Sequence, residues 1–404
     1  MNTFLVGGAV RDRLLGQPSN DLDYVVVGSS VEEMLAEGFK QVGSFFPVFL
    51  HPSTGDEYAL ARTEVKESIG HQGFACCFRS DVTLEQDLER RDLTVNAMAV
   101  CQKSGGVLDM HRGMADLSNK VLRHVSDAFA EDPLRVFRTA RFAATLDFQV
   151  APETMHKMRE VVVSGELETL PGERVFKEME KALKGKNPRR FFEVLHEVGG
   201  LDHFFPELEA LTQVPAGPAK YHGGANAFQH TMNALDHLAG RCHPLATMFA
   251  ALCHDLGKGL TPPSEFPRHL NHEKTGIQLT KALCERLRVP KKATALALLV
   301  TEHHLRLLRF TETTKAGKFM TLFENFKAFH SDDMLCKAFA VADADSKAHK
   351  GGEGASAKLT LVLKVLEAMK SVDTKALAVG VGPEKAQEAV RAAKLEAATR
   401  FIRD

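Results

Sequence analysis

The sequence predicts an α+β protein, with a mixed α/β head at the N-terminus and all-helical regions after it. Short apolar runs bounded by turn residues occupy roughly the first 125 residues, a pattern typical of strands in a mixed sheet. From about residue 126 onward, apolar residues recur at spacings of three and four, which is the period of amphipathic helices. A hydrophobic fraction of 44% and a charged fraction of 25% are typical of a globular chain.

Changes of pattern divide the chain into four parts. Three prolines (Pro206, Pro215 and Pro218) mark a loop before a His-rich helical region, and HKGGEGASAK at 349–358 has the composition of a flexible linker. The predicted parts are a head at 1–125, a helical neck and body at 126–221, a His-rich helical domain at 222–345, and a linker with a helical tail at 346–404. Candidate strands of the head are Phe4–Val6, Tyr24–Val27, Glu57–Ala61, Thr94–Val100 and Val107–Asp109.

The segment LVGGAVRDRLLG predicts a turn between the first strand and the first helix. Gly7 and Gly8 permit a close approach of backbone N–H groups to phosphate oxygens, and Arg11 adds a charged donor. A Gly-Gly turn alone is more typical of a plain strand-to-helix connection than of a phosphate site. The phosphate interpretation therefore needs support from other residues of the chain.

Two carboxylates supply that support within fifteen residues of the turn. Asp21 and Asp23 stand at the start of an apolar run that reads as a buried strand, where residues two apart share one face. Their repulsion destabilises the fold unless a cation offsets it. Mg²⁺ prefers oxygen ligands and bridges carboxylates to substrate phosphates, so the pair predicts a site for two-metal phosphoryl transfer.

Two later motifs add basic and base-reading groups. Arg91 in LERRDLTVNAMAV is a candidate for bidentate hydrogen bonds to a triphosphate, or for a surface ion pair with Asp92. In EDPLRVFRTARF, Pro133 suits the first helical turn, which makes Asp132 a candidate N-cap. Alternatively Asp132, which only accepts hydrogen bonds, and Arg135, which only donates them, together match the edges of cytosine and adenine and reject uracil and guanine.

The ordered motifs GGAVRD, DLD, RRDLTVNA, EDPLRVFRTARFA and GERVFKEM resemble class II CCA-adding tRNA nucleotidyltransferases, in particular the bacterial subgroup with a C-terminal HD domain. The resemblance implies a polymerase-β-like head and addition of C, C and A to tRNA 3′ ends without a nucleic-acid template. It implies Mg²⁺ on Asp21 and Asp23. By the same resemblance, CTP or ATP contacts Gly8, Arg11, Arg91, Asp132, Arg135 and Arg138, and Glu173 and Arg174 support the base-reading pair.

A second group of candidate ligands lies in the His-rich region. AALCHDLGKGL contains His254 and Asp255, AFQHTM contains His230, TEHHL contains His303 and His304, and VADAD contains Asp343 and Asp345. This spacing resembles an HD phosphohydrolase metal site, and imidazole with carboxylate suits Ni²⁺ or another transition metal. Our predicted ligand set is His230, His254, Asp255, His304 and Asp343, with His303 and Asp345 as the alternatives and with His269 and His272 as further candidates.

The resemblance also implies partners and activities. It implies tRNA, ATP and CTP as partners, and hydrolysis of 2′,3′-cyclic phosphates, 2′-nucleotides and simple phosphates by the HD domain. We expect a cytoplasmic monomer or weak homodimer with reduced thiols and no membrane association, since no run of 18 apolar residues occurs. The alternatives are a CC-adding, A-adding or poly(A) polymerase relative, or a tRNA-binding protein in which only the HD hydrolase is active. The segment 62–88 matches the family's flexible loop at full length, which argues against a CC-adding relative.

Overall fold

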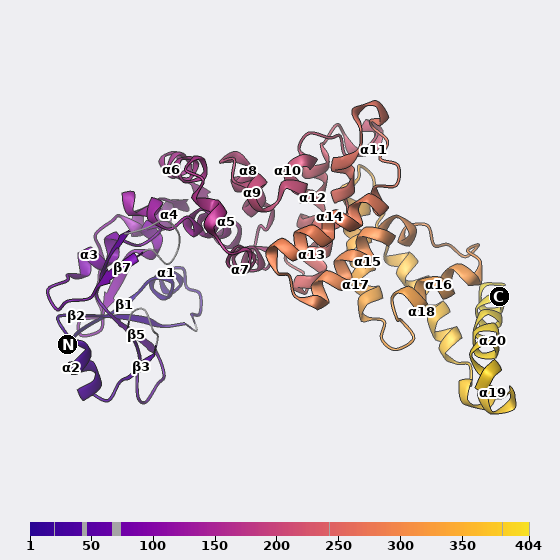
Figure 1. Ribbon diagram of the computed structural model, residues 1–404, viewed down its shortest axis with the longest axis horizontal. Helices are drawn as coiled ribbons and strands as arrows, with labels where there is room; N and C mark the ends of the chain where they lie inside the picture. The colour runs from indigo at the N-terminus through magenta and orange to yellow at the C-terminus, as the bar shows by residue number, and fades with distance from the viewer. Residues whose placement is uncertain (20, 43–46, 67–73, 242, 382, 404) are drawn as a thin grey trace. The chain divides into compact units, whose positions relative to one another are not determined.

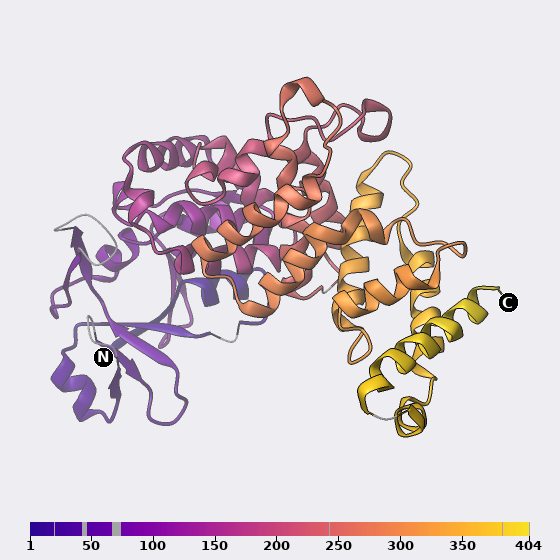
Figure 2. The ribbon, with the colours of Figure 1, turned by 45° about the vertical axis from the view of Figure 1, so that its right-hand side comes forward.

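The computed structural model describes residues 1–19, 21–42, 47–66, 74–241, 243–381 and 383–403. The chain forms two compact units, Met1–His203 and Phe204–Asp404. The first unit contains the sheet and the second is helical, as the colours of Figure 1 and Figure 2 show. This confirms the predicted α+β class. No helix in the described ranges is long and apolar enough to cross a membrane.

The head is built on a mixed seven-stranded sheet in the order β3-β4-β5-β2-β1-β8-β9. Its strands are β1 (Asn2–Val6), β2 (Asp23–Val27), β3 (Lys40–Val42), β4 (Val48–Leu50), β5 (Glu57–Leu60), β8 (Met98–Cys101) and β9 (Val107–Asp109). Short pairs are formed by β6 (Thr63–Lys66) with β7 (Phe74–Cys77), and by β10 (Val121–Leu122) with β11 (Gln149–Val150). In the central part, β2 runs antiparallel to β1 and parallel to β5.

Burial on both faces explains the uninterrupted apolar run of β2. Val25 packs into one hydrophobic cluster with Val6 and Leu88, and its neighbour Val26 packs into another with Phe49. Successive strand residues point to opposite faces, so an apolar residue is needed at every position. The strand begins at the exposed Asp23, and the chain enters the core with the residues that follow.

Two sequence expectations about strands are corrected. The predicted strand Thr94–Val100 is a strand only from residue 98 onward, because Thr94–Asn96 form a 3-10 turn, η1. Its buried Thr94 and Asn96 side chains hydrogen-bond to carboxylates, which favours a local turn over a sheet ladder. The strands β3, β4, β6, β7, β10 and β11 were not predicted.

The predicted flexible loop at 62–88 lies partly outside the described residues, at 67–73.

Helices complete the first unit. The periodic segment LRVFRTARFAATL is helix α5 (Leu134–Leu146), as predicted, and it packs against α7 (Gly172–Leu183) and α8 (Arg189–Glu197). The others are α1 (Gly8–Leu14), α2 (Val31–Ala36), α3 (Leu84–Glu89), α4 (Gly113–Asn119) and α6 (Pro152–Val163), with the 3-10 helices η2 (Asp127–Glu131) and η3 (Glu166–Thr169); α9 (Leu201–Phe204) lies at the boundary between the units.

The second unit is a helical bundle. Helices α12 (Ala227–Leu238), α13 (Leu245–Cys253), α14 (His272–Leu287), α15 (Lys291–Leu307) and α17 (Asp333–Ala348) pack together with η4 (Leu256–Leu260). The remaining elements are α10 (Pro206–Leu211), α11 (Ala219–His222), η5 (Pro263–Glu265), α16 (Ala316–Asn325), α18 (Ser356–Lys370), α19 (Thr374–Val381) and α20 (Pro383–Arg403). The expected linker is shorter than predicted, since α18 begins at residue 356.

Candidate active sites

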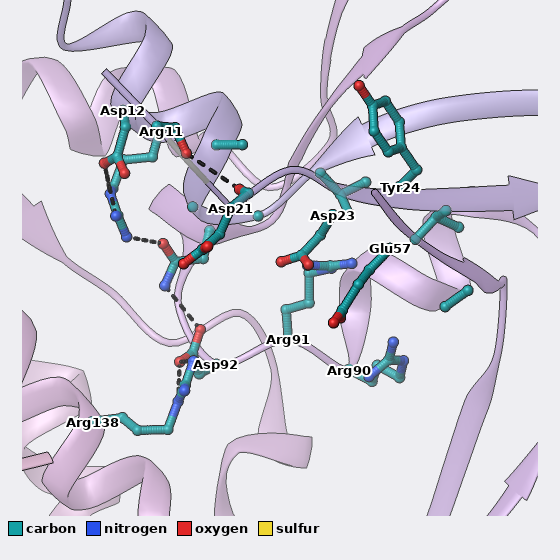
Figure 3. Close-up of a pocket in the computed structure, with 18 of the residues that line it drawn as sticks. Arg11, Asp12, Asp21, Asp23, Tyr24, Glu57, Arg90, Arg91, Asp92 and Arg138 are labelled. Atoms are coloured by element: carbon teal, nitrogen blue, oxygen red, sulfur yellow. Dashed lines mark hydrogen bonds and ion pairs between the residues drawn. The ribbon is translucent and has the colours of Figure 1, made fainter. Parts of the chain in front are cut away.

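A cavity of about 1110 Å³ opens in the first unit where the carboxyl end of β1, the start of β2 and the N-terminal part of α5 face one another. Every predicted residue of the phosphoryl-transfer site lines it: Gly8, Arg11, Asp21, Asp23, Arg91, Asp132, Arg135 and Arg138. Figure 3 labels five of them, Arg11, Asp21, Asp23, Arg91 and Arg138. The structure thus brings together motifs that are more than a hundred residues apart in the sequence.

Three of the carboxylates that line this cavity lie at the start of β2 and β5. Asp23 is the first residue of β2, Asp21 precedes the strand, and Glu57 begins the parallel neighbour β5 directly opposite Asp23. Burial raises the pKa of Asp23, and the charges of Glu57 and Asp21 raise it further, although Arg91 lowers it. A cation bound between these carboxylates would relieve their mutual repulsion. Sequence reasoning missed Glu57, because its signal depends on knowing that β2 and β5 are neighbours.

The basic wall of the cavity is fixed by a buried carboxylate. Asp87 accepts hydrogen bonds from Arg90 at 2.7 Å and from Arg91 at 3.1 Å. Burial alone would raise the pKa of Asp87, but the two guanidinium groups hold it below its usual value. Gly7 has a φ of 72°, and a Cβ there would lie 3.2 Å from Arg91 Nη1. The glycine turn and Arg91 therefore meet at the cavity, as the phosphate interpretation requires.

A polar chain links α1 to α5 through the head. Arg11 Nη1 donates to Asn96 Oδ1 at 2.7 Å, Asn96 Nδ2 donates to Asp92 Oδ1 at 3.1 Å, and Arg138 Nε donates to Asp92 Oδ2 at 2.8 Å (Figure 3). Burial by itself would raise the pKa of Asp92, but Arg138 and the hydrogen bond from Asn96 hold it well below its usual range. Asp92 thus pairs with Arg138 in the interior rather than with Arg91 on the surface.

Each member of the predicted base-reading pair also has partners elsewhere in the first unit. Asp132 Oδ1 accepts a hydrogen bond from the backbone N–H of Leu134 at 3.0 Å, so the carboxylate caps α5, and Asp132 Oδ2 lies 3.7 Å from Arg174 Nη2. The buried Arg135 guanidinium donates to the carbonyls of Ala128 and Arg90. Asp132 therefore has Arg174 as its guanidinium neighbour, and Arg174 Nη1 is buried without a hydrogen-bond partner.

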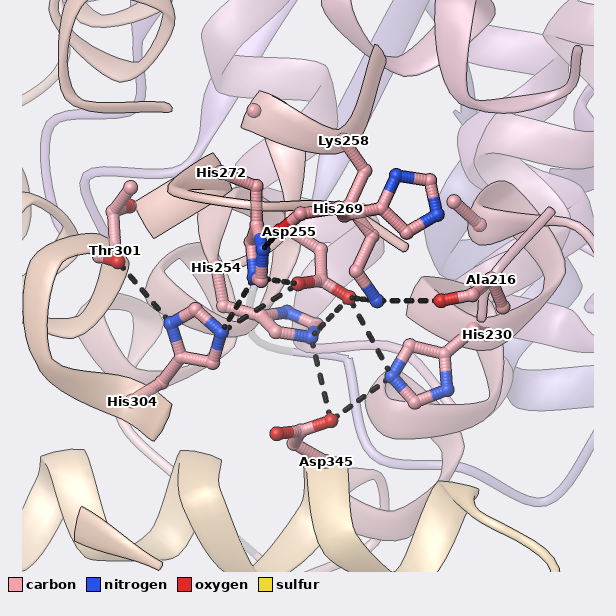
Figure 4. A network of polar contacts seen from close by, with 12 residues as sticks. Ala216, His230, His254, Asp255, Lys258, His269, His272, Thr301, His304 and Asp345 are labelled. Atoms are coloured by element: carbon pink, nitrogen blue, oxygen red, sulfur yellow. Dashed lines mark hydrogen bonds and ion pairs between the residues drawn. The ribbon is translucent and has the colours of Figure 1, made fainter. Parts of the chain in front are cut away.

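The second unit contains a cluster of four buried histidines and two buried aspartates. We call this set the His/Asp cluster (Figure 4): His230, His254, Asp255, His272, His304 and Asp345. His230 Nε2 lies 2.9 Å from Asp345 Oδ1, and His254 Nε2 lies 3.2 Å from Asp255 Oδ2. Burial alone would lower the pKa of His254, but Asp255 and Asp345 raise it to about 10. The carboxylates therefore impose a potential that attracts cations.

Two of the ligand alternatives are decided by the rotation of their helices. Asp343, our predicted choice, lies outside the cluster: its carboxylate accepts hydrogen bonds from Lys347 Nζ at 2.7 Å and from the N–H of Ala355 at 2.7 Å. Residues two apart on a helix point about 200° apart, so Asp345 faces the cluster instead. The structure thus places Asp345, and not the predicted Asp343, beside His230 and His254. His304 lies in the cluster as predicted, whereas His303 Nε2 lies 3.1 Å from Asn325 Nδ2.

Of the two further candidate histidines, one lies in the cluster and the other lies outside it. His272, the first residue of α14, points its Nε2 at Asp255 Oδ1 at 3.2 Å. His269 bonds to Thr261 Oγ1 and to the carbonyl of Pro215, outside the cluster. Imidazole with carboxylate is a ligand set suited to transition metals, so the cluster fits such an ion.

Comparison with known families gives three consecutive matches. Residues 3–123 match the poly A polymerase head domain, residues 147–212 match a probable RNA- and SrmB-binding site of polymerase A, and residues 227–346 match the HD domain. A nucleotide polymerase head followed by an RNA-binding segment and an HD domain is the class of protein that the fold and the two sites define.

Full-length relatives specify the family. A multifunctional CCA protein of Paraburkholderia phymatum is 45% identical over 413 aligned positions, covering 100% of this chain and 99% of the relative. One of Pseudomonas syringae is 48% identical, covering 87% of this chain and 86% of the relative. The chain belongs to the family of multifunctional CCA proteins.

Solved structures share the fold. The Bacillus stearothermophilus CCA-adding enzyme in complex with CTP has a TM-score of 0.65 at 23% identity, covering 99% of this chain and 89% of that chain. The Thermotoga maritima CCA-adding enzyme complexed with tRNA has a TM-score of 0.63 at 19% identity, covering 98% of this chain and 86% of that chain.

Proposed function

We infer that this enzyme adds and repairs the 3′-terminal CCA of tRNA with CTP and ATP, without a nucleic-acid template. The observation that carries this inference is the convergence of Asp21, Asp23 and Glu57 on one cavity, opposite Arg91 and the Gly7-Gly8 turn. The full-length relatives that carry the name multifunctional CCA protein support it.

The carboxylates of the cavity fit Mg²⁺. Asp21 and Asp23 would hold it, with Glu57 as a third oxygen donor, and bound Mg²⁺ neutralises charge that develops during phosphoryl transfer. Arg91, held by Asp87, supplies donors for phosphate oxygens, and Gly7 and Gly8 at the start of α1 line the same cavity. The chain's own residues therefore orient the triphosphate before the reaction begins.

The base-reading function fits four residues of the α5 side of the cavity: Asp132, Arg135, Arg138 and Arg174. We place the acceptor on Asp132 and the donor on Arg174, whose Nη1 is buried without a hydrogen-bond partner. Arg135 and Arg138 then hold this wall against the head. An acceptor beside a donor matches cytosine and adenine and mismatches uracil and guanine.

The His/Asp cluster supports a second, metal-dependent activity. We propose that His230, His254, Asp255 and Asp345 hold Ni²⁺ or another transition metal, which would activate water toward 2′,3′-cyclic phosphates, 2′-nucleotides and simple phosphates. Lys258 Nζ lies 2.6 Å from Asp255 Oδ2 at the same place, where its charge can also contact a phosphate. We further propose a cytoplasmic location, and a monomer or weak homodimer as the working form.

Extension of tRNA lacking its terminal CCA tests the first activity. Incubation with labelled CTP and ATP, followed by gel analysis, should give C, C and A in order. Asp21→Ala and Asp23→Ala should each abolish addition while tRNA binding persists. Addition of C alone, of A alone or of a poly(A) tail would instead indicate one of the related polymerases. Wild-type turnover in either variant would contradict the metal assignment.

A further inference from the structure

We propose that His222 and His349 bind the phosphate ester at the second site without ligating its metal, and that Asp343 is the residue that positions His349. This inference rests on the proposed hydrolysis of phosphate esters at the His/Asp cluster and adds the residues that face the substrate there. It is drawn from the ring contacts of the two histidines, from their hydrogen-bonding capacity, and from the contacts that hold the segment 349–355.

Two further imidazoles pack against the cluster on the side of His230. The His349 ring stacks on the His230 ring, with centroids 5.0 Å apart and 14° between the ring planes. The His222 ring meets both edge to face, with its centroid 5.0 Å from that of His230 and 4.5 Å from that of His349. All six residues of the cluster are buried, whereas the side chain of His349 is 30% exposed and His222 is half-buried. A substrate that approaches from this side therefore meets these two rings first.

Both rings have hydrogen-bonding groups that the fold leaves unused. His222 Nδ1 is buried without a hydrogen-bond partner, and His349 Nε2 lies 3.8 Å from Asp345 Oδ1, which is too far for a hydrogen bond. The neighbouring His269 differs, because its two ring nitrogens bond to Thr261 Oγ1 and to a backbone carbonyl. An imidazole ring always carries at least one N–H donor. His222 and His349 can therefore donate to phosphate oxygens, whereas His269 is already engaged.

The stacking geometry sets His349 apart from the metal ligands. A ring nitrogen directs its lone pair within the plane of its own ring. The His230 ring points Nε2 at Asp345 Oδ1, 2.9 Å away. The His349 ring is nearly parallel to that of His230, so its nitrogens point alongside those of His230 and do not converge with them. His349 is therefore placed to contact a molecule beside the cluster.

The loop that carries His222 also fixes a positive charge. Lys258 Nζ donates to the carbonyl of Ala216 at 2.8 Å, a contact that Figure 4 shows beside the cluster. A Cβ on the next residue, Gly217, would lie 2.6 Å from His222 Nε2, so only glycine leaves room for the ring. The ammonium group and the imidazole are thus held by adjacent residues of one loop. A cation beside N–H donors is the combination that binds phosphate oxygens.

The segment 349–355, whose composition predicts a flexible linker, is a tight turn against α17. The N–H of Gly354 donates to Ser346 Oγ at 3.2 Å. A Cβ on Gly352 would collide with the carbonyl oxygen of Ser346, and a Cβ on Gly354 would collide with the Asp343 carboxylate. These two glycines therefore permit a close approach to the helix. The turn that begins with His349 is a built feature of the fold.

Asp343 and Tyr221 hold this turn from its two ends. The Asp343 carboxylate accepts a hydrogen bond from the N–H of Ala355 at 2.7 Å, where the turn ends. The N–H of Lys350 donates to the carbonyl of Tyr221 at 2.7 Å, where the turn begins. The second contact joins the residue after His349 to the residue before the other ring. Asp343 therefore acts on the substrate through the position of His349.

Paired substitutions at His349 distinguish a donor from a packing residue. His349→Phe keeps a ring that can stack on His230 but has no N–H, whereas His349→Gln and His349→Asn lose the ring and keep an amide donor. The substrate is 2′,3′-cyclic AMP, with Ni²⁺-loaded full-length protein. We expect His349→Phe and His222→Phe each to raise KM roughly 10- to 150-fold with kcat within about threefold. At least one amide variant should recover most of the loss.

Replacing Asp343 by alanine tests the positioning role. Asp343→Ala should accelerate hydrogen exchange of the amides at 349–356 and raise KM for 2′,3′-cyclic AMP, because the turn loses its anchor. Asp333→Ala is the matched control: Asp333 lies on the same helix and pairs with a lysine four residues later, as Asp343 does, but its side chain is 61% exposed. The control should change neither quantity. Equal effects of the two substitutions would overturn the positioning role.

Bound Ni²⁺ separates substrate residues from metal ligands. Plasma mass spectrometry in an Asp21→Asn/Asp23→Asn background should give the same Ni²⁺ content for the phenylalanine variants as for the unsubstituted cluster. Loss of Ni²⁺ would make His222 or His349 a ligand and overturn the proposal. An unchanged KM in both phenylalanine variants would overturn it as well. So would full activity of His349→Phe with none in the amide variants, since ring packing alone would then explain the contact.

Two measurements need no substitution at the cluster. Saturating inorganic phosphate should slow hydrogen exchange of the amides at 349–352 in the unsubstituted, Ni²⁺-loaded protein, and exchange that phosphate does not change would overturn the proposal even if every variant were unfolded. Absence of cyclic phosphodiesterase activity in the unsubstituted protein would instead contradict the proposed hydrolase function on which the inference rests. Circular dichroism checks that each variant is folded.

Discussion

Replacing Arg138 by methionine should loosen the junction between α5 and the head. Arg138 donates to Asp92 Oδ2 through Nε at 2.8 Å and pairs with it through Nη2 at 2.6 Å. Arg138→Met keeps the apolar stem of the side chain but leaves the Asp92 carboxylate, only 5% exposed, without its charged partner. The change therefore tests whether this pair, rather than apolar packing alone, holds the base-reading wall in place.

The structure sets the expected magnitude. Removing one member of a fully buried ion pair costs about 3–5 kcal/mol. The Arg138 side chain is 35% exposed, so water reaches the vacated space, and Asn96 and the N–H of Leu93 still donate to the carboxylate. We therefore expect the free energy of local opening to fall by about 2–3 kcal/mol. This corresponds to roughly 30- to 150-fold more frequent opening.

Hydrogen exchange measured by mass spectrometry is the appropriate assay, because a chain with two units has no single unfolding transition. Amides of α5 and of η1 should exchange roughly 30- to 150-fold faster in Arg138→Met. Asp92→Asn combined with Arg138→Met removes the stranded charge and should recover most of the protection. Exchange within about threefold of the unsubstituted protein would refute the reasoning.

The pH dependence gives a second check on the same pair. The folded-state pKa of Asp92 lies well below its ordinary value, so the pair stabilises the fold above that ordinary value and loses this contribution only as pH falls through the folded pKa. Loss of Arg138 removes the largest influence that lowers the pKa of Asp92, so this pKa rises although Asn96 and Arg135 still lower it, and protonation then relieves the buried charge. The difference in exchange between Arg138→Met and the unsubstituted protein should therefore narrow from pH 8 to pH 5. An unchanged difference would mean that lost packing dominates.

Three further outcomes are expected at the two sites. Glu57→Gln should slow nucleotide addition at least about tenfold, with partial recovery at high Mg²⁺, whereas indifference to Mg²⁺ would place Glu57 outside the metal site. Asp132→Ala and Arg174→Ala should each raise incorporation of UTP and GTP relative to CTP, at about 1–3 kcal/mol per lost contact; unchanged fidelity would leave Asp132 as a helix cap only. His254→Ala with Asp255→Ala should eliminate cyclic phosphodiesterase activity and keep most CCA addition, and loss of both activities in a folded protein would show that the sites are coupled.

Local sequence signals were sufficient to predict the central strands and helix α5 of the first unit. Helix α5 begins and ends where its apolar period does, after Pro133 restricts the backbone at its start. The edge strand β3 and its neighbour β4 were not predicted. Each has only three residues, and β3 (KQV) contains a single apolar residue. The 3-10 turn at Thr94–Asn96 was not predicted, because its buried polar side chains hydrogen-bond to carboxylates and so override the strand preference of the neighbouring residues.

The partners of the site residues could not be predicted from the sequence, because they arise from contacts between distant segments. Asp132 and Arg135 are close in sequence, yet Asp132 meets Arg174, because α7 packs against α5. Glu57 became a candidate only through the pairing of β5 with β2. No local period carries such information, since it arises when separate elements pack.

The ligand alternatives of the His/Asp cluster show where a finer local signal existed and where it did not. Asp345 follows the buried Val341 by four residues and continues the apolar face of α17, whereas Asp343 precedes Lys347 by four and pairs with it at the surface. The period of α17 therefore favours Asp345, and a count of faces would have found it. On α15 the same count fails: His303 and His304 are both buried, because that helix packs on more than one side and its apolar residues form no single face. There the choice between adjacent histidines is made by what lies opposite each ring, Asn325 or Asp255, and only the packed bundle supplies it.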